Sequence, residues 1–319
     1  MSRPDTSVTC APAPPGRTGA VPERALVAPA RPTGCAEVWM RGVSLGYPTR
    51  DGFALVLEGI DLHLCSGERL AVVGASGCGK STLLHALAGL LQPVRGSVCV
   101  TGFPEGAGGA AGRAAAASSI ACPRDHAAYM FQNDLLLPWK PALANAAFAG
   151  ELALSSGPMW SGRRRSRAAR EAIRERARSL LCEFGLGDSL HLFPHQLSGG
   201  MRQRVALART LALGRGLVLL DEPFGSLDAL TRSDLRDWMV RVMDTHAATW
   251  VLVTHDVDEA VQLADRVVVL GGHPASVQGS VDVTSVRGHP EETEGRLLGG
   301  GLRGAAARVH DLLHEGRGH

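Results

Sequence analysis

The sequence lacks the features expected of a membrane-spanning, secreted or nucleic-acid-binding protein. No stretch reaches the roughly 18 consecutive apolar residues of a membrane span, and the N-terminus has no apolar signal-peptide core. A net charge of +2 over 319 residues argues against a nucleic-acid partner. The seven cysteines include no CxxC pair, so we expect reduced thiols in a cytoplasmic protein. Any membrane span of the working complex must then come from other chains.

Three segments lack hydrophobic periodicity, and they set the expected domain boundaries. Residues 1–36, rich in Pro, Ala, Arg and Thr, are expected to form a disordered tail. The Gly/Ala-rich residues 102–126 are expected to form a flexible surface insertion. Residues 274–319 are expected to form an irregular tail with one weak helix. The folded domain then spans 37–273, with a helical part at about 134–200.

A glycine-rich loop lies between a strand-like and a helix-like segment. Arg69–Val73 reads as a short buried strand, and Lys80–Leu91 places leucines on one helical face. The loop matches G-x-x-x-x-G-K-[ST] at every fixed position, which predicts phosphate binding, although a plain glycine turn is the alternative. Curled backbone N–H groups and the helix start attract an anion. The expected phosphate-binding residues are Gly74, Ala75, Ser76, Gly77, Cys78, Gly79, Lys80, Ser81 and Thr82.

Within this loop three side chains have individual expected roles. Lys80 supplies a point charge for the β- and γ-phosphates, and the Ser81 hydroxyl is a ligand for Mg²⁺. Cys78 lies next to a helix N-terminus, which can lower the pKa of a thiol. We therefore expect that alkylation of Cys78 blocks nucleotide binding and that the bound nucleotide protects the thiol.

A second strong pattern is an unbroken apolar run that ends in two acids. Leu217–Leu220 fits a buried parallel strand, and Asp221 and Glu222 follow at the end where ligands bind in open α/β sheets. We predict that Asp221 is the Mg²⁺-side carboxylate and that Glu222 accepts a proton from an attacking water. A plain strand-to-loop transition is the alternative.

Three polar or aromatic residues each leave two interpretations open. Gln132, at the end of the strand Ala128–Phe131, is either a core amide or a movable ligand for Mg²⁺ or water. His255, after Trp250–Thr254, is either a core histidine or a contact on the γ-phosphate side, which the shared sheet edge favours. Tyr47, placed by its glycine and proline neighbours in a turn, is either a strand-edge aromatic or a platform for a purine base.

A second glycine-rich turn, Leu197–Met201, opens the expected helix Arg202–Leu213. The Ser198 hydroxyl and the N–H groups of Gly199 and Gly200 form a possible anion site at a helix start. The turn contains no lysine, so an ordinary N-cap by Ser198 is the alternative.

Two stretches indicate contacts with partners or solvent. The apolar run Leu135–Trp139 is unusual for a free surface and indicates a docking site. Arg163–Arg178 is dense in arginine with interleaved Glu171 and Glu175, which is typical of a solvated helix face with i,i+4 pairs. Contact with anionic lipid headgroups is the alternative, since about 1 kcal/mol per basic residue is available near a charged membrane.

With these motifs in this order, residues 37–273 resemble the ATP-binding subunit of ABC transporters. Gly74–Thr82 is similar to the Walker A loop of that family, and Leu217–Glu222 to its Walker B strand. Leu197–Met201 resembles the ABC signature, with methionine where many members have glutamine. Residues 226–228, ending in Asp228, resemble the D-loop.

Single residues also match positions of the family. Gln132 resembles the Q-loop glutamine and His255 the switch histidine, while Tyr47 falls where the family places its adenine-stacking aromatic. The resemblance implies an α/β P-loop NTPase (ABC ATPase) fold with a mainly parallel core sheet, an antiparallel β subdomain and a helical subdomain. It also implies a head-to-tail homodimer in which each ATP, with Mg²⁺, lies between the Walker A loop of one subunit and the signature turn of the other. Permease subunits would dock near Leu135–Trp139.

The Leu-Leu-Pro-Trp run and the Leu-Ser-Gly-Gly-Met-Arg-Gln-Arg turn resemble importers of the nitrate/sulfonate/taurine type, with importers of thiamine-precursor pyrimidines as relatives. The function so implied is an ATPase on the inner face of the cell membrane. It would couple ATP hydrolysis to solute import through permease subunits. These subunits would in turn connect it to a solute-binding protein. The alternative is a soluble ABC-type ATPase not linked to transport, although neither a coiled-coil insertion nor a second cassette is visible. A P-loop kinase would have no use for the signature turn.

Overall fold

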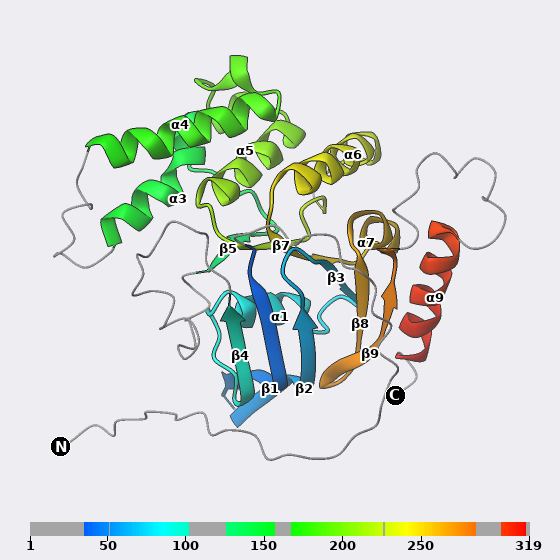
Figure 1. The fold of residues 1–319 in the computed structure, drawn as a ribbon. Helices are drawn as coiled ribbons and strands as arrows, with labels where there is room; N and C mark the ends of the chain where they lie inside the picture. Colours follow the sequence, from blue (N-terminus) through cyan, green and yellow to red (C-terminus); the bar gives the residue numbers. More distant parts are fainter. Residues whose placement is uncertain are drawn as a thin grey trace, which may run out of the picture. The chain divides into compact units, whose positions relative to one another are not determined.

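The computed structural model describes residues 35–50, 52–101, 126–156, 167–225, 227–284 and 301–316, all within one compact unit. A nine-stranded sheet is covered by helices, and a group of helices lies beyond one of its edges (Figure 1). The strands are β1 (Glu37–Thr49), β2 (Gly52–Leu64), β3 (Arg69–Gly74), β4 (Arg95–Thr101), β5 (Ala127–Met130), β6 (Leu217–Asp221), β7 (Thr249–Thr254), β8 (Arg266–Gly272) and β9 (Ala275–Asp282). The helices are α1 (Lys80–Leu87), α3 (Ala142–Ser156), α4 (Arg167–Glu183), α5 (Gly199–Ala212), α6 (Ala229–Thr245), α7 (Val257–Leu263) and α9 (Leu302–Glu315), with short 3₁₀ turns η3 (Gly187–Ser189) and η4 (Pro194–Gln196).

The core of the sheet is parallel, and this brings the predicted motifs to one edge. The strand order is β4-β1-β2-β9-β8-β3-β7-β6-β5, and β8, β3, β7, β6 and β5 run parallel to one another. In the register, Val73 lies opposite Thr254 and Asp221 lies opposite Val253. The phosphate loop, the two acids and His255 therefore follow adjacent strand ends, where open α/β sheets bind their ligands.

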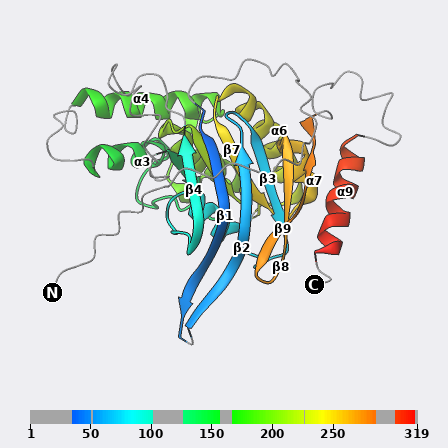
Figure 2. The same ribbon diagram turned by 60° about the horizontal axis from the view of Figure 1, so that its bottom comes forward.

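The other part of the sheet is antiparallel, as Figure 2 shows for β4, β1 and β2. The turn predicted at Tyr47 is wrong, because Tyr47 lies within β1 and pairs with Ala54 on β2. Glycine is needed at position 46 because of close packing between the strands, since a Cβ there would lie 2.2 Å from the Ala54 carbonyl oxygen. Pro48 is tolerated because it lies near the end of the hairpin, opposite Phe53.

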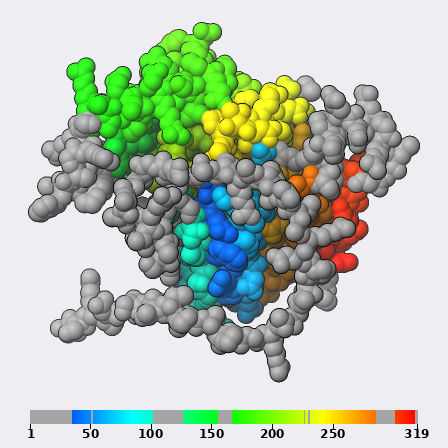
Figure 3. Space-filling view, in the orientation of Figure 1, coloured from blue at the N-terminus to red at the C-terminus, as the bar shows by residue number. Residues whose placement is uncertain are grey.

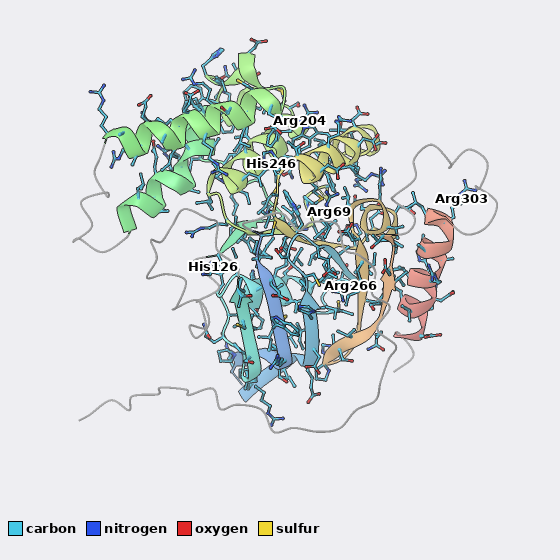
Figure 4. All side chains as sticks on the ribbon, viewed as in Figure 1. Arg69, His126, Arg204, His246, Arg266 and Arg303 are labelled. Atoms are coloured by element: carbon cyan, nitrogen blue, oxygen red, sulfur yellow. The ribbon has the colours of Figure 1, made fainter. Side chains whose placement is uncertain are left out.

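Helices α3 and α4 lie in the predicted helical part at about 134–200, and α5 extends it to Ala212; the three are seen in green in the space-filling view (Figure 3). Its contact with α6 is aromatic: the Phe184 ring meets Trp238 edge-on at 4.8 Å, and the Arg204 guanidinium lies 5.2 Å from the centre of the Trp238 ring. An ion pair of 3.0 Å between His246 and Glu183 adds to this contact, and Figure 4 labels both Arg204 and His246. None of the described helices is both long and apolar enough to cross a bilayer.

The expectation of an irregular tail beyond residue 273 is wrong for the described residues there, apart from its predicted helix. Strand β9 pairs antiparallel with β8, for example Val281 with Val267. Helix α9 buries Ala305 and Val309 in a cluster with α7 and β8. The interpretation failed because β9 has few apolar residues, and its pairing with β8, whose central residues are apolar and buried, makes it part of the sheet.

The boundary of the N-terminal tail also moves. Residues 1–34 and 102–125, expected to be disordered and flexible, lie outside the described residues. Cys35 and Ala36, assigned to the tail by the sequence, are buried. The Ala36 N–H donates to the Gly216 carbonyl oxygen at 3.1 Å, and the Thr249 hydroxyl donates to the Ala36 carbonyl. The folded part therefore begins before β1.

Candidate functional site

The phosphate loop folds around its own lysine. Lys80 is 6% exposed, and its Nζ donates to the carbonyl oxygens of Gly74 at 2.9 Å and Ala75 at 3.0 Å. Gly77 and Gly79 have φ angles of +81° and +103°, which side chains with a Cβ rarely adopt. Gly79 is the N-cap of α1 and provides no side-chain cap, so the first N–H groups of this helix remain available to an anion.

Asp221, the last residue of β6, has both carboxylate oxygens occupied by hydroxyl donors. Ser81 Oγ donates to Oδ1 at 3.1 Å, and the Tyr129 hydroxyl donates to Oδ2 at 2.8 Å. Burial raises the pKa of Tyr129, and its hydrogen bond to Asp221 raises it further, so the phenol stays neutral and keeps donating. The sequence interpretation missed Tyr129, because its contact depends on β5 lying beside β6.

Glu222 contacts two other predicted residues, Gln132 and His255. Its Oε2 accepts from Gln132 Nε2 at 3.1 Å and lies 3.3 Å from His255 Nδ1. Its φ of +43° is unusual for a residue with a Cβ, and such strain is concentrated at functional sites. The strain is supported by hydrogen bonds from Glu222 N–H to Val253 O at 2.9 Å and from Gly225 N–H to Glu222 O at 3.1 Å. The structure thus brings together every residue predicted for this edge of the sheet.

The oxygen atoms beside the loop fit the predicted Mg²⁺ ion. Ser81 and Asp221 offer a hydroxyl and a carboxylate only 3.1 Å apart, and Mg²⁺ prefers such hard oxygen ligands. No group of three or more His, Cys, Asp or Glu side chains in the described part of the chain could hold a metal ion alone. This agrees with the way Mg²⁺ is bound with nucleotides, by one or two protein oxygens together with the phosphates.

Tyr47 extends the site away from the strand ends. Its ring is 38% exposed, and its hydroxyl lies 3.4 Å from Thr82 Oγ1 and 3.5 Å from His85 Nδ1. The tyrosine on β1 therefore lies against the first two turns of α1, beside the phosphate loop.

The second glycine-rich turn lies apart from the first. Ser198 is exposed and caps α5 by accepting from the Met201 N–H at 3.3 Å. No hydrogen bond or ion pair between described residues joins this turn to the phosphate loop. Instead, Gly199 and Gly200 pack against the start of α6, where a Cβ on either glycine would lie 3.1 Å from Leu227 or Thr231.

The predicted D-loop leads into α6. Asp228 is the N-cap of α6, and its carboxylate accepts from the Thr231 N–H at 3.0 Å. Leu227 is buried beside Gly199, while Ser226 lies outside the described residues. The D-loop and signature turns therefore form one surface of this chain.

The expectation of a low thiol pKa at Cys78 is wrong. Cys78 is 8% exposed, and burial raises the pKa of its thiol although the nearby positive charge of Lys80 opposes this effect. A Cβ at Gly74 would lie 2.7 Å from Cys78 Sγ, which shows how closely the loop packs around the sulfur. Desolvation outweighs the helix N-terminus at this position.

The apolar run after Gln132 displays its side chains from a firmly held backbone. Leu135 is 53% exposed and Trp139 is 70% exposed. Arg209 donates to the Leu135 carbonyl oxygen at 2.8 Å, and buried Asn145 accepts from the Leu137 N–H at 2.7 Å. The strained φ of +45° at Leu135 is thus stabilised by hydrogen bonds on both sides.

The ion pairs of the arginine-rich helix α4 differ from the predicted i,i+4 spacing. Arg174 pairs with Glu151 of α3 at 2.7 Å, and Arg178 pairs with Glu175, three residues earlier, at 3.6 Å. Both contacts are typical of a solvated helix face.

Comparisons with known proteins agree with this geometry. Residues 57–225 match the family model described as ABC transporter. The aliphatic sulfonates import ATP-binding protein SsuB 1 of Xanthomonas axonopodis pv. citri (strain 306) is 38% identical over 82% of this chain and 94% of its own. The nitrate transport protein NasD of Klebsiella oxytoca is 37% identical over 76% of this chain and 84% of its own. The bicarbonate transport ATP-binding protein CmpD of Synechocystis sp. (strain ATCC 27184 / PCC 6803 / Kazusa) is 38% identical over 76% of this chain and 77% of its own.

Solved structures agree as well. The dimeric structure of MJ0796, a bacterial ABC transporter cassette, is similar with a TM-score of 0.57 at 28% identity, over 77% of this chain and 98% of that one. A post-hydrolysis state of the same cassette, bound to ADP and Pi, is similar with a TM-score of 0.53. The predicted fold, with its parallel core, antiparallel β subdomain and helical subdomain, is confirmed. The chain therefore belongs to the ABC transporter family and has the fold of its ATP-binding cassettes.

Proposed function

We propose that this protein binds MgATP and hydrolyses it to drive the import of a small solute through partner permease subunits. The observation that carries the proposal is the convergence of Gln132 and His255 on Glu222, next to the Ser81–Asp221 pair. The relatives are named for sulfonate, nitrate and bicarbonate, which supports a small anion as the solute over a thiamine-precursor pyrimidine.

The phosphate loop holds the triphosphate. Lys80 Nζ now donates to two loop carbonyls, and phosphate oxygens would take over these donor hydrogens as charge-assisted hydrogen bonds. The free N–H groups at the start of α1 surround the same anion. The exposed ring of Tyr47 beside Thr82 then provides a surface on which adenine stacks.

Ser81, Asp221 and Gln132 would hold the Mg²⁺ ion, with Tyr129 fixing the second oxygen of Asp221. When bound, Mg²⁺ neutralises charge on the β- and γ-phosphates. Glu222 orients the attacking water and accepts its proton, because its side chain is the one acidic group to which both Gln132 and His255 point. His255 in turn reaches toward the γ-phosphate.

The working unit is a head-to-tail homodimer. The signature turn of Ser198, Gly199 and Gly200 presents a helix start with an exposed N-cap serine, and no hydrogen bond or ion pair between described residues joins it to the phosphate loop of its own chain. In the dimer it would cover the γ-phosphate held by the partner's loop, and Asp228 would lie in the same interface. The dimeric cassettes among the similar structures support this arrangement.

The exposed side chains of Leu135 and Trp139 form the docking site for the permease subunits, which link the protein to a solute-binding protein. On this proposal the protein works in the cytoplasm, peripheral on the inner face of the cell membrane. A soluble ABC-type ATPase would not retain a permease, so co-purification from detergent extracts distinguishes the two functions. The variant Trp139→Asp should lose the permease while keeping its MgATP binding.

The activity is tested with Glu222→Gln, which keeps the shape of the side chain but removes the proton acceptor. We expect ATP affinity to persist, phosphate release to fall by at least about a hundredfold, and a stable ATP-bound dimer to form. Phosphate release and light scattering after gel filtration measure these effects, with the exposed Glu58→Gln as the charge-matched control. A Glu222→Gln protein with the wild-type rate would refute the role.

A further inference from the structure

A carboxylate that the proposed reaction does not use is buried next to the site. Glu259, on α7, is 4% exposed. Its Oε2 accepts from Thr254 Oγ1 at 2.7 Å. Burial raises the pKa of Glu259, and the Thr254 hydrogen bond opposes the rise. A buried acid needs partners to be tolerated, and here the partners come from the end of β7 (Thr254) and from α6 (Arg232).

The first link runs from Glu259 to His255. Thr254 is the last residue of β7, and its hydroxyl donates to Glu259 while accepting from the Asp256 N–H at 3.0 Å. The backbone on both sides of His255 is therefore tied to one hydroxyl group. Asp256 Oδ1 also accepts from the Glu259 N–H at 3.2 Å, which closes a ring of contacts around the histidine.

The second link runs from Glu259 to the D-loop. Arg232 Nε lies 3.9 Å from Glu259 Oε1, and another nitrogen of the same guanidinium donates to the Leu227 carbonyl oxygen at 3.1 Å. Leu227 in turn packs against Gly199 of the signature turn. Among the described residues, the charged or polar groups that act on the Glu259 carboxylate are Thr254, Asp256, Arg232 and Arg236.

We propose that Glu259 is a positioning residue that couples the D-loop to the switch histidine through Arg232 on one side and Thr254 on the other. The inference rests on the proposed function, because the D-loop and the signature turn are the parts expected to meet the partner subunit. Arg232 Nε and Arg236 Nε are buried without a hydrogen-bond partner in the described residues, and Glu259 interacts with both positive charges, at 3.9 Å in the case of Arg232. A displacement of Leu227 on dimer formation changes the guanidinium position and, through Glu259, the setting of His255.

The chain provides two matched pairs for the test. Thr254 and Thr249 are the last and first residues of β7, are 1% and 0% exposed, and both donate a hydroxyl hydrogen bond. Glu259 and Glu68 both pair with an arginine, but Glu68 and its partner Arg266 lie at the other end of β3 and β8, where Figure 4 labels Arg266. Thr249→Val and Glu68→Gln therefore report the cost of losing a buried contact far from the site.

We expect Thr254→Val and Glu259→Gln each to lower the kcat for ATP about tenfold while the KM changes less than about twofold, because only the setting of His255 is disturbed. Thr249→Val and Glu68→Gln should lower the melting temperature without this loss of kcat. The double variant Thr254→Val/Glu259→Gln should lose no more than either single variant, since both act through one path.

Equal kcat losses in the site variants and their controls, or additive losses in the double variant, would overturn the inference. If Glu259→Gln does not fold, Thr254→Val against Thr249→Val decides the question alone, and a wild-type kcat in Thr254→Val then overturns it. A wild-type protein that does not hydrolyse MgATP would instead refute the proposed function. The two failures are thus distinguishable.

Discussion

The two glycine-rich turns of this chain look alike in sequence and differ in structure. The turn before α1 encloses Lys80, which is 6% exposed, and has the Ser81–Asp221 pair beside it. The turn before α5 has no charged side chain, and its Ser198 is exposed and caps its own helix. The first turn is one half of an anion site with its charges in place, and the second is a helix start that faces outward.

A glycine-rich helix start is therefore not by itself an anion-binding site. What distinguishes the two turns is the neighbouring strand end, because β6 brings Asp221 and Glu222 to the first turn and no strand ends at the second. On the proposed function, the second turn acts on a phosphate held by a second copy of the chain. The contrast between the two turns therefore supports the head-to-tail dimer, and the experiments below test each turn.

The largest effect is expected from Lys80→Ala. Lys80 and Lys140 are the only lysines in the sequence, so Lys140→Ala is a matched control outside the loop. Loss of the buried ammonium should weaken ATP binding by at least about a hundredfold, or about 3 kcal/mol, while the Lys140 variant binds normally. Fluorescence titration with a labelled ATP analogue measures both affinities. Equal affinities for the two variants would contradict the claim that the turn before α1 binds ATP through Lys80.

A smaller effect is expected from Ser198→Asp, which separates the two interpretations of the second turn. Aspartate is as good an N-cap as serine, so α5 should stay intact and the melting temperature should hardly change. A negative charge there would repel the partner's triphosphate, and turnover should fall about tenfold or more while ATP binding to the single chain persists. A variant with wild-type turnover would show that Ser198 is only a helix cap.

A still smaller effect is expected from Tyr47→Ala, which tests whether the nucleotide site at the first turn includes a stacking surface for the adenine base. Stacking on an aromatic ring contributes about 1–3 kcal/mol per base, so the Kd for ATP should rise about tenfold. Tyr47→Phe keeps the ring and should bind ATP almost as tightly as the wild type. If the alanine variant binds as well as the phenylalanine variant, Tyr47 is a strand-edge aromatic without a role in binding.

The smallest effect concerns Cys78. Because burial raises the pKa of its thiol, Cys78 should react with iodoacetamide at pH 7 about tenfold more slowly than the exposed Cys182. Mass spectrometry of peptides after timed alkylation measures the two rates. That ATP protects Cys78 stays a prediction, and rapid labelling of Cys78 would show that the first turn opens more readily than its packing indicates.

Contiguous binding motifs could be predicted from the sequence, whereas contacts between separate strands and helices could not. The loop from Gly74 to Lys80 and the acids at the end of β6 were found because each motif is contiguous and flanked by the right elements. Tyr129 and Glu259 were missed because their roles depend on which strand or helix lies beside them. No local pattern encodes such a neighbour.

Elements whose local signal conflicts with their packing were also mispredicted. Gly46 and Pro48 suggested a turn at Tyr47, yet this stretch is a strand because β2 pairs with it. Strand β9 has a weak apolar pattern and is fixed by β8. At Cys78 the helix start predicted a low pKa, but burial, which the sequence does not reveal, decides the direction.

The most direct test of the head-to-tail dimer is to mix the Lys80→Ala protein, which should bind ATP weakly, with the Ser198→Asp protein, which should turn over at no more than about a tenth of the wild-type rate. In a head-to-tail dimer the mixed pair contains one intact site, made by Lys80 of one chain and Ser198 of the other. If the sites are shared between the two chains of such a dimer, the rate of ATP hydrolysis should rise on mixing to a substantial fraction of the wild-type rate. Activity that stays at the level of the separate variants would contradict it.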